Sequence, residues 1–429
     1  MGPWRSVSKL SKVWYNSGLI VQSFFKFSRK DLMFKPLTIE PTGRLQKLPP
    51  YLFAEIDKKK RELIAKGKDV IDLGVGDPDI PTADFIIEAL STAAKNPRNH
   101  RYALDQGMPE FRHAIRDWFQ RRFGVKLDPD KEILPLIGSK EGIGHLPLAV
   151  LDPGKVCLIP DPGYPVYRSG TLFAEGIPYT MPLLEKNSYF PDFDAIPEDV
   201  LRNTRLMFLN YPNNPTSQVA DKAFFEKAVT FAHKHGILIA HDAAYSEMCY
   251  EGLKSPSILE VHGAKEIAVE LFSLSKTYSM TGWRIGFAVG NAQMLSLLAK
   301  VKSNLDSGIF QAIQIAGIKA LQDGQKELEK NLKIYQERRD LLVQGFRSLG
   351  WKIEAPKATF YVWIPVPAGY TSAELALKFL EELNIVVTPG NGFGPNGEGY
   401  FRISLTVAES RIMEALDRIK KSHPHHSKL

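Results

Sequence analysis

One lysine, Lys276, lies among small hydroxyl residues directly after an apolar run, and Arg284 follows eight positions later. A lysine amine can form a covalent imine with an aldehyde, while Ser273, Ser275 and Arg284 can hold a phosphate group on the same molecule. These residue types at this spacing indicate a site for pyridoxal phosphate (PLP), a cofactor that supplies the chemistry while the protein supplies orientation and charge. An exposed loop lysine after a strand is the alternative for this stretch taken alone.

Several short apolar runs must position these residues. They span 133–137, 156–159, 206–209, 237–240, 269–273 and 285–289, and helical patterns such as 221–235 separate several of them. Because the runs show no polar alternation, they are typical of strands buried on both faces, and so of an α/β fold with a largely parallel sheet. Ligands bind beyond the carboxyl ends of such strands, so we expect one site assembled from several loops.

A chain of 429 residues predicts two domains. A helical pattern over 311–348 is long enough to link them, and an α+β pattern follows, with strands at 352–354, 360–364, 385–387 and 400–404 and helices at 373–383 and 410–420. We therefore divide the chain into an N-terminal extension (1–32), an arm with part of a small domain (33–80), a large PLP-binding domain (81–325), a small C-terminal domain (326–422) and a His-rich tail (423–429).

Polar residues at the ends of the apolar runs are candidate site residues. Asp242 follows a buried strand, where its carboxylate needs a partner such as a protonated pyridine nitrogen. A structural or helix-capping aspartate is the alternative. Tyr245 and Asn214 can donate hydrogen bonds to a phenolate oxygen, although such residues also occur in turns and cores.

Further candidates suit a phosphate, a flat ring and a carboxylate. Ser139 and Lys140 stand where a helix is expected to begin, and backbone N–H groups there can bind phosphate. Tyr164 can stack on a flat ring or pack within its loop. Arg402 lies in a short apolar strand, where an unpaired guanidinium is costly. A substrate carboxylate held by two parallel hydrogen bonds is one partner for it, and a structural salt bridge is the alternative.

As a set, these residues resemble those of fold-type I PLP-dependent aminotransferases of the aspartate aminotransferase superfamily, over roughly residues 40–420. The resemblance implies a large domain with a mostly parallel seven-stranded sheet between helices, a smaller α+β domain formed from both termini, and a homodimer with shared active sites. The motifs that carry it are Tyr102 with Gly107, Asn213-Asn-Pro-Thr216, Asp242 with Tyr245, Ser273-x-Ser-Lys276, Gly282-x-Arg284 and Arg402.

The resemblance also implies a role for each residue. Lys276 binds PLP covalently and then acts as general acid and base, while Asp242 pairs with the pyridine nitrogen. Asn214 and Tyr245 hold the phenolic oxygen, and Arg402 binds the α-carboxylate of the amino acid. The phosphate is held by Ser139, the backbone of Lys140, Ser273, Ser275, Arg284 and, from the neighbouring subunit, Tyr102.

A narrower set of motifs, at 49–53, 74–79, 102–107, 138–142, 161–165 and 302–308, is similar to the bacterial branch of the LL-diaminopimelate aminotransferase family. This resemblance implies a ping-pong transfer from LL-2,6-diaminopimelate to 2-oxoglutarate, giving tetrahydrodipicolinate and L-glutamate in lysine biosynthesis. Lys140 suits the second carboxylate of that substrate, and Ser217 departs from the family pattern, since many members have glycine there. The implied substrate-binding residues are Tyr51, Gly76, Lys140, Tyr164, Asn214, Arg402 and, across the dimer, Asn304.

Three other functions stay open. Aminotransferases of aspartate, alanine, methionine or aromatic amino acids share the core motifs, and a lyase can use the same cofactor. A PLP-binding regulator without turnover would carry a winged-helix domain, for which the roughly 40 residues before the matched part are too few.

The composition bears on partners and compartment. Six basic residues and no acidic ones lie in the first 30 residues, so the net charge of +7 falls to +1 for the remainder. We therefore expect no nucleic-acid partner. Cys157 and Cys249 lie in apolar surroundings and are too few for a disulfide framework, which favours reduced thiols in a cytoplasmic protein.

The ends of the chain carry weaker signals. The uncharged run 15–25 is too short to span a bilayer, so no membrane partner is expected. The basic N-terminal segment loosely fits a transit peptide, but we favour a poorly ordered extension or a start at Met33. The final Ser-Lys-Leu would be a peroxisomal address only in a eukaryotic host. The tail histidines His423, His425 and His426 could bind a metal, but a frayed tail is the simpler interpretation, and we predict no metal site.

Overall fold

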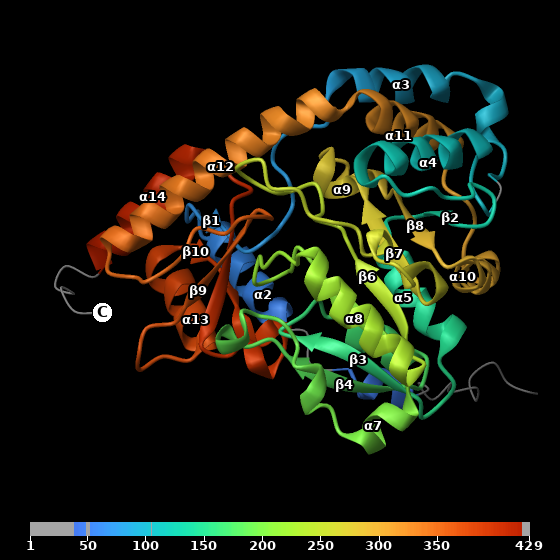
Figure 1. The fold of residues 1–429 in the computed structure, drawn as a ribbon. Helices are drawn as coiled ribbons and strands as arrows, with labels where there is room; N and C mark the ends of the chain where they lie inside the picture. The colour runs from blue at the N-terminus through green and yellow to red at the C-terminus, as the bar shows by residue number, and fades with distance from the viewer. Residues whose placement is uncertain (1–37, 49–51, 104, 423–429) are drawn as a thin grey trace, which may run out of the picture. The chain divides into compact units, whose positions relative to one another are not determined.

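The structure, a computed structural model, describes residues 38–48, 52–103 and 105–422, with side chains from residue 56 onward in the second helix (Figure 1). The chain divides between Gln46 and Lys47 into two compact units. The first contains the short helix α1 (Gly43–Gln46), and everything below concerns the second. The predicted extension at 1–32 and the tail at 423–429, with its histidines and its Ser-Lys-Leu end, lie outside the described residues.

A seven-stranded sheet forms the centre of the second unit (Figure 1). Its strands, from one edge to the other, are β2 (Ile133–Leu136), β8 (Gly286–Gly290), β7 (Ala268–Ser273), β6 (Leu238–Asp242), β5 (Thr204–Asn210), β3 (Val156–Asp161) and β4 (Ile177–Pro182). Pairing is parallel from β7 to β4, whereas β8 runs antiparallel to both β7 and β2. The predicted α/β fold with a mostly parallel sheet is therefore confirmed.

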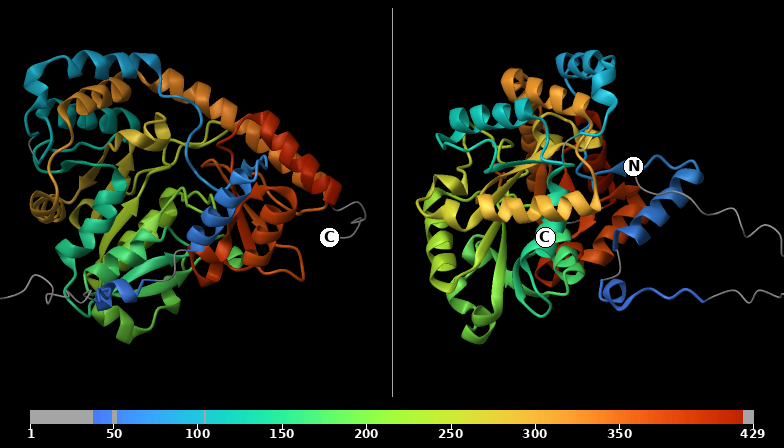
Figure 2. Two further views of the ribbon diagram at one scale, coloured as in Figure 1. Left: turned by 180° about the vertical axis from the view of Figure 1, so that it is seen from behind. Right: turned by 90° about the vertical axis from the view of Figure 1, so that its right-hand side faces the viewer.

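Helices cover both faces of this sheet (Figures 1 and 2). In β5, Leu206 and Phe208 join one apolar cluster and Met207 and Leu209 join another, so successive side chains face opposite layers. This two-sided burial explains why the strand sequences are apolar without alternation. The first cluster includes α5 (Ser139–Val150), α6 (Val166–Phe173) and α10 (Ala292–Leu305); the second includes α3 (Asp84–Ala94), α4 (Pro109–Phe123), α8 (Lys222–His235) and α11 (Gln311–Asp323).

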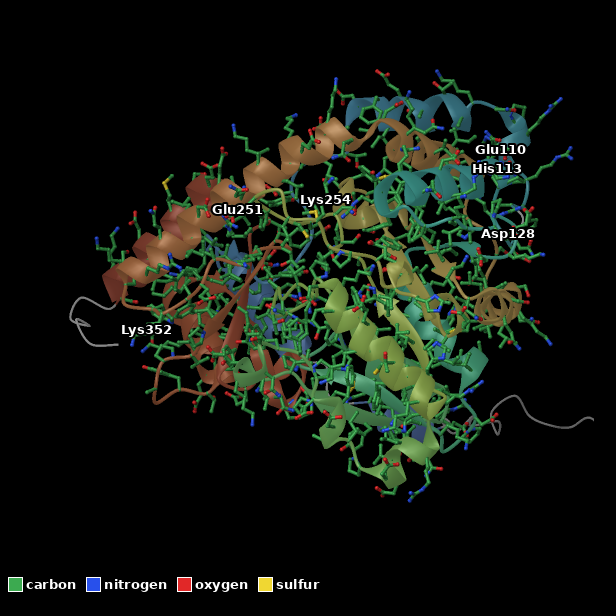
Figure 3. All side chains as sticks on the ribbon, in the orientation of Figure 1. Glu110, His113, Asp128, Glu251, Lys254 and Lys352 are labelled. Carbon is green, nitrogen blue, oxygen red and sulfur yellow. The ribbon has the colours of Figure 1, made fainter. Side chains whose placement is uncertain are left out.

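A separate α+β core lies beside the sheet. It joins the antiparallel strands β11 (Thr388–Pro389), β12 (Tyr400–Ser404) and β9 (Tyr361–Pro365) to α12 (Gln325–Ser348), α13 (Ser372–Leu383) and α14 (Glu409–Ser422). After α2 (Leu52–Ala65), β1 (Ile71–Asp72) pairs in parallel with β10 (Ile385–Val386). Segments that precede and follow the large sheet in the sequence therefore build this part together. Charged side chains such as Glu110, Lys254 and Lys352, labelled in Figure 3, are exposed.

The structure corrects three details of the predicted elements. Residues 352–354 form no strand, and the carbonyl oxygen of Ile353 accepts a hydrogen bond from Arg347 Nε (2.9 Å) instead of a ladder bond. The helical pattern over 311–348 is two helices, interrupted at Gly324. Strand β4 was not predicted, because it lies at an edge, contains two prolines and is only partly buried. Among the described residues, none of the helices is both long and apolar enough to cross a membrane.

Candidate active site

A cavity of about 460 Å³ lies between the carboxyl ends of the parallel strands and the α+β core. Its wall draws on segments from Ile56 to Arg402, as expected for a site assembled from several loops. Most of the residues predicted from the sequence line it: Gly76, Ser139, Lys140, Tyr164, Asn214, Asp242, Tyr245, Ser273, Ser275, Lys276, Arg284 and Arg402.

The lysine enters the cavity from a short helix, α9 (Leu274–Thr277), which directly follows β7. Ser273 caps this helix, since its hydroxyl accepts a hydrogen bond from the Ser275 amide (3.2 Å). Lys276 Nζ donates a hydrogen bond to the carbonyl oxygen of Gly76 (2.8 Å). Burial lowers the pKa of the Lys276 ammonium, although Tyr361 and Asp77 oppose the shift. A lowered pKa increases the neutral amine fraction, which is the form that attacks a carbonyl carbon.

One end of the cavity is a cradle for an anion. Helix α5 begins at Ser139 after Gly138, whose φ of 77° lies in the left-handed region that favours glycine. A Cβ atom at Gly138 would lie 2.5 Å from Nη2 of Arg284, so the glycine allows the guanidinium to lie against the helix start. The N–H groups at this helix start, the hydroxyls of Ser273 and Ser275 and the guanidinium of Arg284 together suit a phosphate group.

Another part of the cavity wall is a buried carboxylate at the end of β6. Asp242 accepts hydrogen bonds from the hydroxyl of Tyr167 (2.8 Å) and the amide of Ala244 (3.2 Å). Burial raises the pKa of Asp242, while these two donors act to lower it. No ion pair of the described residues involves this carboxylate. A buried carboxylate with only neutral donors would be stabilised as the anion by a cationic ring nitrogen.

Arg402 reaches the cavity from β12 between two aromatic rings. Its guanidinium lies 3.9 Å from the ring centre of Tyr361 and 4.8 Å from that of Phe393. Nη1 donates to Asn214 Oδ1 and Nη2 to the carbonyl oxygen of Gly74, both at 2.7 Å. The alternative of a structural salt bridge finds no support in the described part of the chain, where Arg402 pairs with no carboxylate. One hydrogen on each Nη therefore stays free for a ligand carboxylate.

Three site residues were missed from the sequence. Tyr361 lines the cavity, and Asn210 holds the loop that carries Asn214, since its side chain accepts from the Asn214 amide (2.8 Å) and donates to the Asp242 carbonyl (2.8 Å). Tyr167 binds Asp242. None stands in a motif that would mark it; only Asn210, at the end of an apolar run, had a positional signal.

Two predicted residues of the described chain, Tyr102 and Asn304, are absent from the cavity wall. The side chain of Tyr102 is 92% exposed. Asn304 is exposed and donates a hydrogen bond to the Lys300 carbonyl oxygen (2.8 Å). Tyr51 lies outside the described residues.

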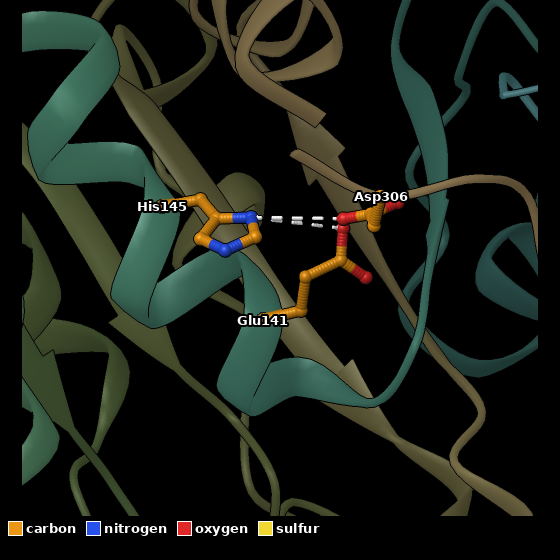
Figure 4. A group of neighbouring side chains, drawn as sticks. All are labelled: Glu141, His145 and Asp306. Carbon is orange, nitrogen blue, oxygen red and sulfur yellow. Dashed lines mark ion pairs between the residues drawn. The ribbon is translucent and has the colours of Figure 1, made fainter. Parts of the chain in front are cut away.

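A cluster of titratable groups includes two residues of helix α5, the helix whose start forms the anion cradle (Figure 4). One nitrogen or oxygen from each of Glu141, His145 and Asp306 lies within 4.8 Å of the other two. The ammonium of Lys302 already bonds Glu141 Oε1 (2.9 Å) and Asp306 Oδ1 (2.6 Å), so a lysine supplies the positive charge that a metal ion would bring.

These parts together define the class of protein. A doubly wound sheet that brings a pKa-lowered lysine, a buried carboxylate and an anion cradle to one cavity fits a PLP enzyme of fold-type I. Residues 68–419 match the family "Aminotransferase class I and II". The chain belongs to this family, so it is a PLP-dependent aminotransferase, and the predicted family, enzyme class and cofactor are confirmed.

Relatives and solved structures agree with this assignment. An LL-diaminopimelate aminotransferase of Moorella thermoacetica is 54% identical over 383 residues, covering 89% of this chain and 98% of that protein. One from Aquifex aeolicus is 54% identical over 381 residues, covering 89% and 98%. The substrate-bound BacF structure from Bacillus subtilis superposes with a TM-score of 0.86 at 40% identity, covering 90% of this chain and 98% of that one.

Proposed function

We propose that this chain transfers the amino group of LL-2,6-diaminopimelate to 2-oxoglutarate by a ping-pong mechanism, giving tetrahydrodipicolinate and L-glutamate for lysine biosynthesis. Relatives named for this activity, 54% identical over nearly their whole length, support the proposal. The observation that carries it is a cavity with two cations in its wall besides Arg284 and the cofactor lysine Lys276, namely Arg402 and Lys140. Two cations suit a substrate that carries a carboxylate at each end.

We assign the reacting residues as follows. PLP, when bound, supplies an electron sink for the electron pair released when the Cα–H bond of the amino acid breaks. Lys276 anchors the cofactor and then moves the proton to and from the substrate Cα. Asp242 keeps the ring nitrogen protonated, and the cost of burying its carboxylate is offset by that cation. Asn214 and Tyr245 bind the phenolic oxygen, and Tyr164 stacks on the ring.

The remaining residues hold the two ends of the ligands. Ser139, the Lys140 backbone, Ser273, Ser275 and Arg284 bind the cofactor phosphate through the cradle at the start of α5. Arg402 binds the substrate α-carboxylate with the free hydrogen on each Nη atom, since Asn214 and Gly74 take the others. The side chain of Lys140 binds the distal carboxylate, and Gly76 is also assigned to the substrate; a Cβ atom at Gly76 would collide with Tyr361 Oη.

We further propose a cytoplasmic homodimer in which each site is completed by the partner. Tyr102 supports this proposal, because it is 92% exposed in the single chain and does not line the cavity of its own chain. In a dimer, its hydroxyl could reach the phosphate in the partner's cavity. Asn304 is assigned to the substrate in the partner's site. Tyr51 is also assigned to the substrate. The division into a large domain (81–325) and a small domain (326–422) is retained with this proposal.

A panel of amino donors with 2-oxoglutarate tests the substrate. The proposal expects the highest kcat/KM for LL-diaminopimelate, above meso-diaminopimelate, aspartate, alanine, methionine and an aromatic donor. Lys140→Ala should raise KM for diaminopimelate by about 10- to 100-fold, the worth of one charge-assisted hydrogen bond, and leave KM for alanine nearly unchanged. An equal rise in KM for both donors would refute the binding of the distal carboxylate by Lys140. A higher kcat/KM for another donor would refute LL-diaminopimelate as the preferred substrate.

Mixed chains test the shared site. Lys276→Ala and Tyr102→Ala chains are each expected to be weakly active or inactive alone. A one-to-one mixture should regain about a quarter of wild-type activity, since half of the dimers are hybrids with one intact site. No recovery on mixing, from chains that do exchange, would show that Tyr102 serves its own chain.

A further inference from the structure

We propose that Tyr361 is a positioning residue that orients both Tyr245, which is assigned to the cofactor, and Arg402, which is assigned to the substrate carboxylate. This inference rests on the roles proposed above for Tyr245 and Arg402. Tyr361 is the first residue of β9, is 3% exposed and lines the cavity. Two functional side chains meet on it, one at its hydroxyl and one at its ring.

The hydroxyl end faces Tyr245. The two phenol oxygens lie 2.9 Å apart, within hydrogen-bond distance. Burial holds the pKa of Tyr245 well above its usual range, so this phenol keeps its proton and can donate it. An anionic phenolic oxygen in the cavity would draw that proton, which leaves Tyr245 Oη to accept from Tyr361. A chain of two such bonds makes Tyr245 the stronger donor.

The ring end supports Arg402. The guanidinium stacks 3.9 Å from the ring centre, a distance at which a cation is attracted to the aromatic face. This contact fixes the plane of the guanidinium, and the plane decides whether both Nη atoms can meet one carboxylate. The ring thereby acts on the amino acid, while the hydroxyl acts on the cofactor.

The surroundings hold Tyr361 in one place. Its amide donates to Thr359 Oγ1 (3.0 Å), and its carbonyl oxygen accepts from the Ser217 hydroxyl (2.9 Å). A Cβ atom at Gly76 would lie 1.8 Å from Tyr361 Oη, so only glycine leaves room for the hydroxyl at this position. The same Gly76 offers its carbonyl oxygen to Lys276. The backbone of Tyr361 is therefore held on both sides, and Gly76 leaves room for its hydroxyl next to Tyr245.

Tyr361→Phe in the PLP-loaded protein separates the two actions, because it keeps the ring and removes the hydroxyl. The readout is a pH titration of the visible absorbance of the bound cofactor without substrate, which reports how strongly the phenolic oxygen is held as an anion. Removing the hydroxyl should raise the apparent pKa of that transition by about half to one unit, with KM for amino donors nearly unchanged. Tyr250→Phe is the matched control, since it removes a buried hydroxyl that bonds the Thr359 carbonyl outside the cavity.

Two further variants complete the test. In a Tyr245→Phe background, Tyr361→Phe should cause no additional shift if it acts through Tyr245. Tyr361→Leu, which removes the ring, should raise KM for amino donors by about tenfold. An unchanged or lowered absorbance pKa in Tyr361→Phe, or additive shifts in the double variant, would overturn the inference. The titration needs no substrate, so a different amino donor would refute the proposed function and leave this result intact.

Discussion

Glu141 offers a stability prediction that can be worked from its contacts. It is the third residue of α5, and one carboxylate oxygen accepts from the Ile137 amide while the other accepts from Lys302 Nζ at 2.9 Å. Lys302 is fully buried and also bonds Asp306 (Figure 4 shows the neighbouring Glu141, His145 and Asp306). Two carboxylates thus share one ammonium, and the cluster carries an excess negative charge in a poorly solvated place.

Burial raises the pKa of Glu141 from 4.5 to about 7, although Lys302 acts to lower it. A carboxyl with a higher pKa in the folded state binds its proton more tightly there. Its stabilising contribution is therefore fully present below pH 4.5 and is lost as the pH rises through about 7. The shift corresponds to about 3–4 kcal/mol at most, at about 1.4 kcal/mol per pKa unit, and coupling to Lys302 makes about 1–3 kcal/mol the expected range.

Glu141→Gln keeps the size of the side chain and one accepting oxygen, and it removes the excess charge. Its NH2 group cannot accept from Ile137 or Lys302, so one hydrogen bond is lost at every pH and lowers stability equally at pH 5 and pH 8.5. The free energy of unfolding of the variant minus that of wild type should be about 1–3 kcal/mol larger at pH 8.5 than at pH 5. For a chain of this length, this corresponds to about 1–3 °C in Tm. Thermal melts of the PLP-free protein at both pH values measure it. Burial lowers the pKa of the nearby His145, so the contribution of His145 to stability rises with pH. Both wild type and Glu141→Gln contain His145, so this contribution cancels in the comparison.

A matched control is Glu327→Gln, because Glu327 pairs with Lys330 at the surface and should show the same small difference from wild type at both pH values. An identical effect of Glu141→Gln at pH 5 and pH 8.5 would refute the reasoning. A larger loss of stability at pH 8.5 would show that the carboxylate, and not the carboxylic acid, is the form the fold prefers.

Three further predictions concern the site itself. Lys276→Ala should lose the label that borohydride fixes on the wild-type PLP-loaded protein and lower kcat by about a thousandfold or more, and wild-type turnover in this variant would end the assigned role. Arg402→Lys should raise KM for amino donors by about 10- to 100-fold with a smaller effect on kcat, because a lysine cannot form two parallel bonds; steady-state kinetics with unchanged KM would contradict it. Ser217→Gly should cost less stability than Ser217→Ala, since both lose the hydroxyl and only glycine relieves the φ of 61°; the reverse order of Tm values would argue against a strained backbone there.

The cofactor end of the site was predictable because its residues stand at the ends of apolar runs. Parallel strands place their carboxyl ends at one edge of a sheet, so Asp242 at the end of β6 and Lys276 just after β7 had to be neighbours. The strands themselves followed from apolar runs without alternation. Residues 352–354 show the limit of that approach, since Ile353 between two charged residues has strand periodicity but no partner strand.

Tyr361 could not be found in this way, because its significance depends on pairings across the fold. Its hydroxyl meets a residue 116 positions away, and nothing in an apolar stretch distinguishes a core tyrosine from one that lines a cavity. Tyr167 is a similar case, with its carboxylate partner 75 positions away. Tyr102 differs again, because its predicted ligand belongs to another subunit, and no single chain can bring the two together.

Ser217 shows how a departure from a family pattern can carry structural information. The position has a φ of 61°, which explains why glycine is common there, and a serine at such an angle is strained. Its hydroxyl bonds the Thr359 hydroxyl (2.6 Å) and the Tyr361 carbonyl oxygen (2.9 Å). These bonds tie the loop that carries Asn214 to the strand that carries Tyr361, and they offset the strain. A glycine would free the backbone but release that tie, so in this chain the serine contributes to holding Tyr361 against Tyr245 and Arg402.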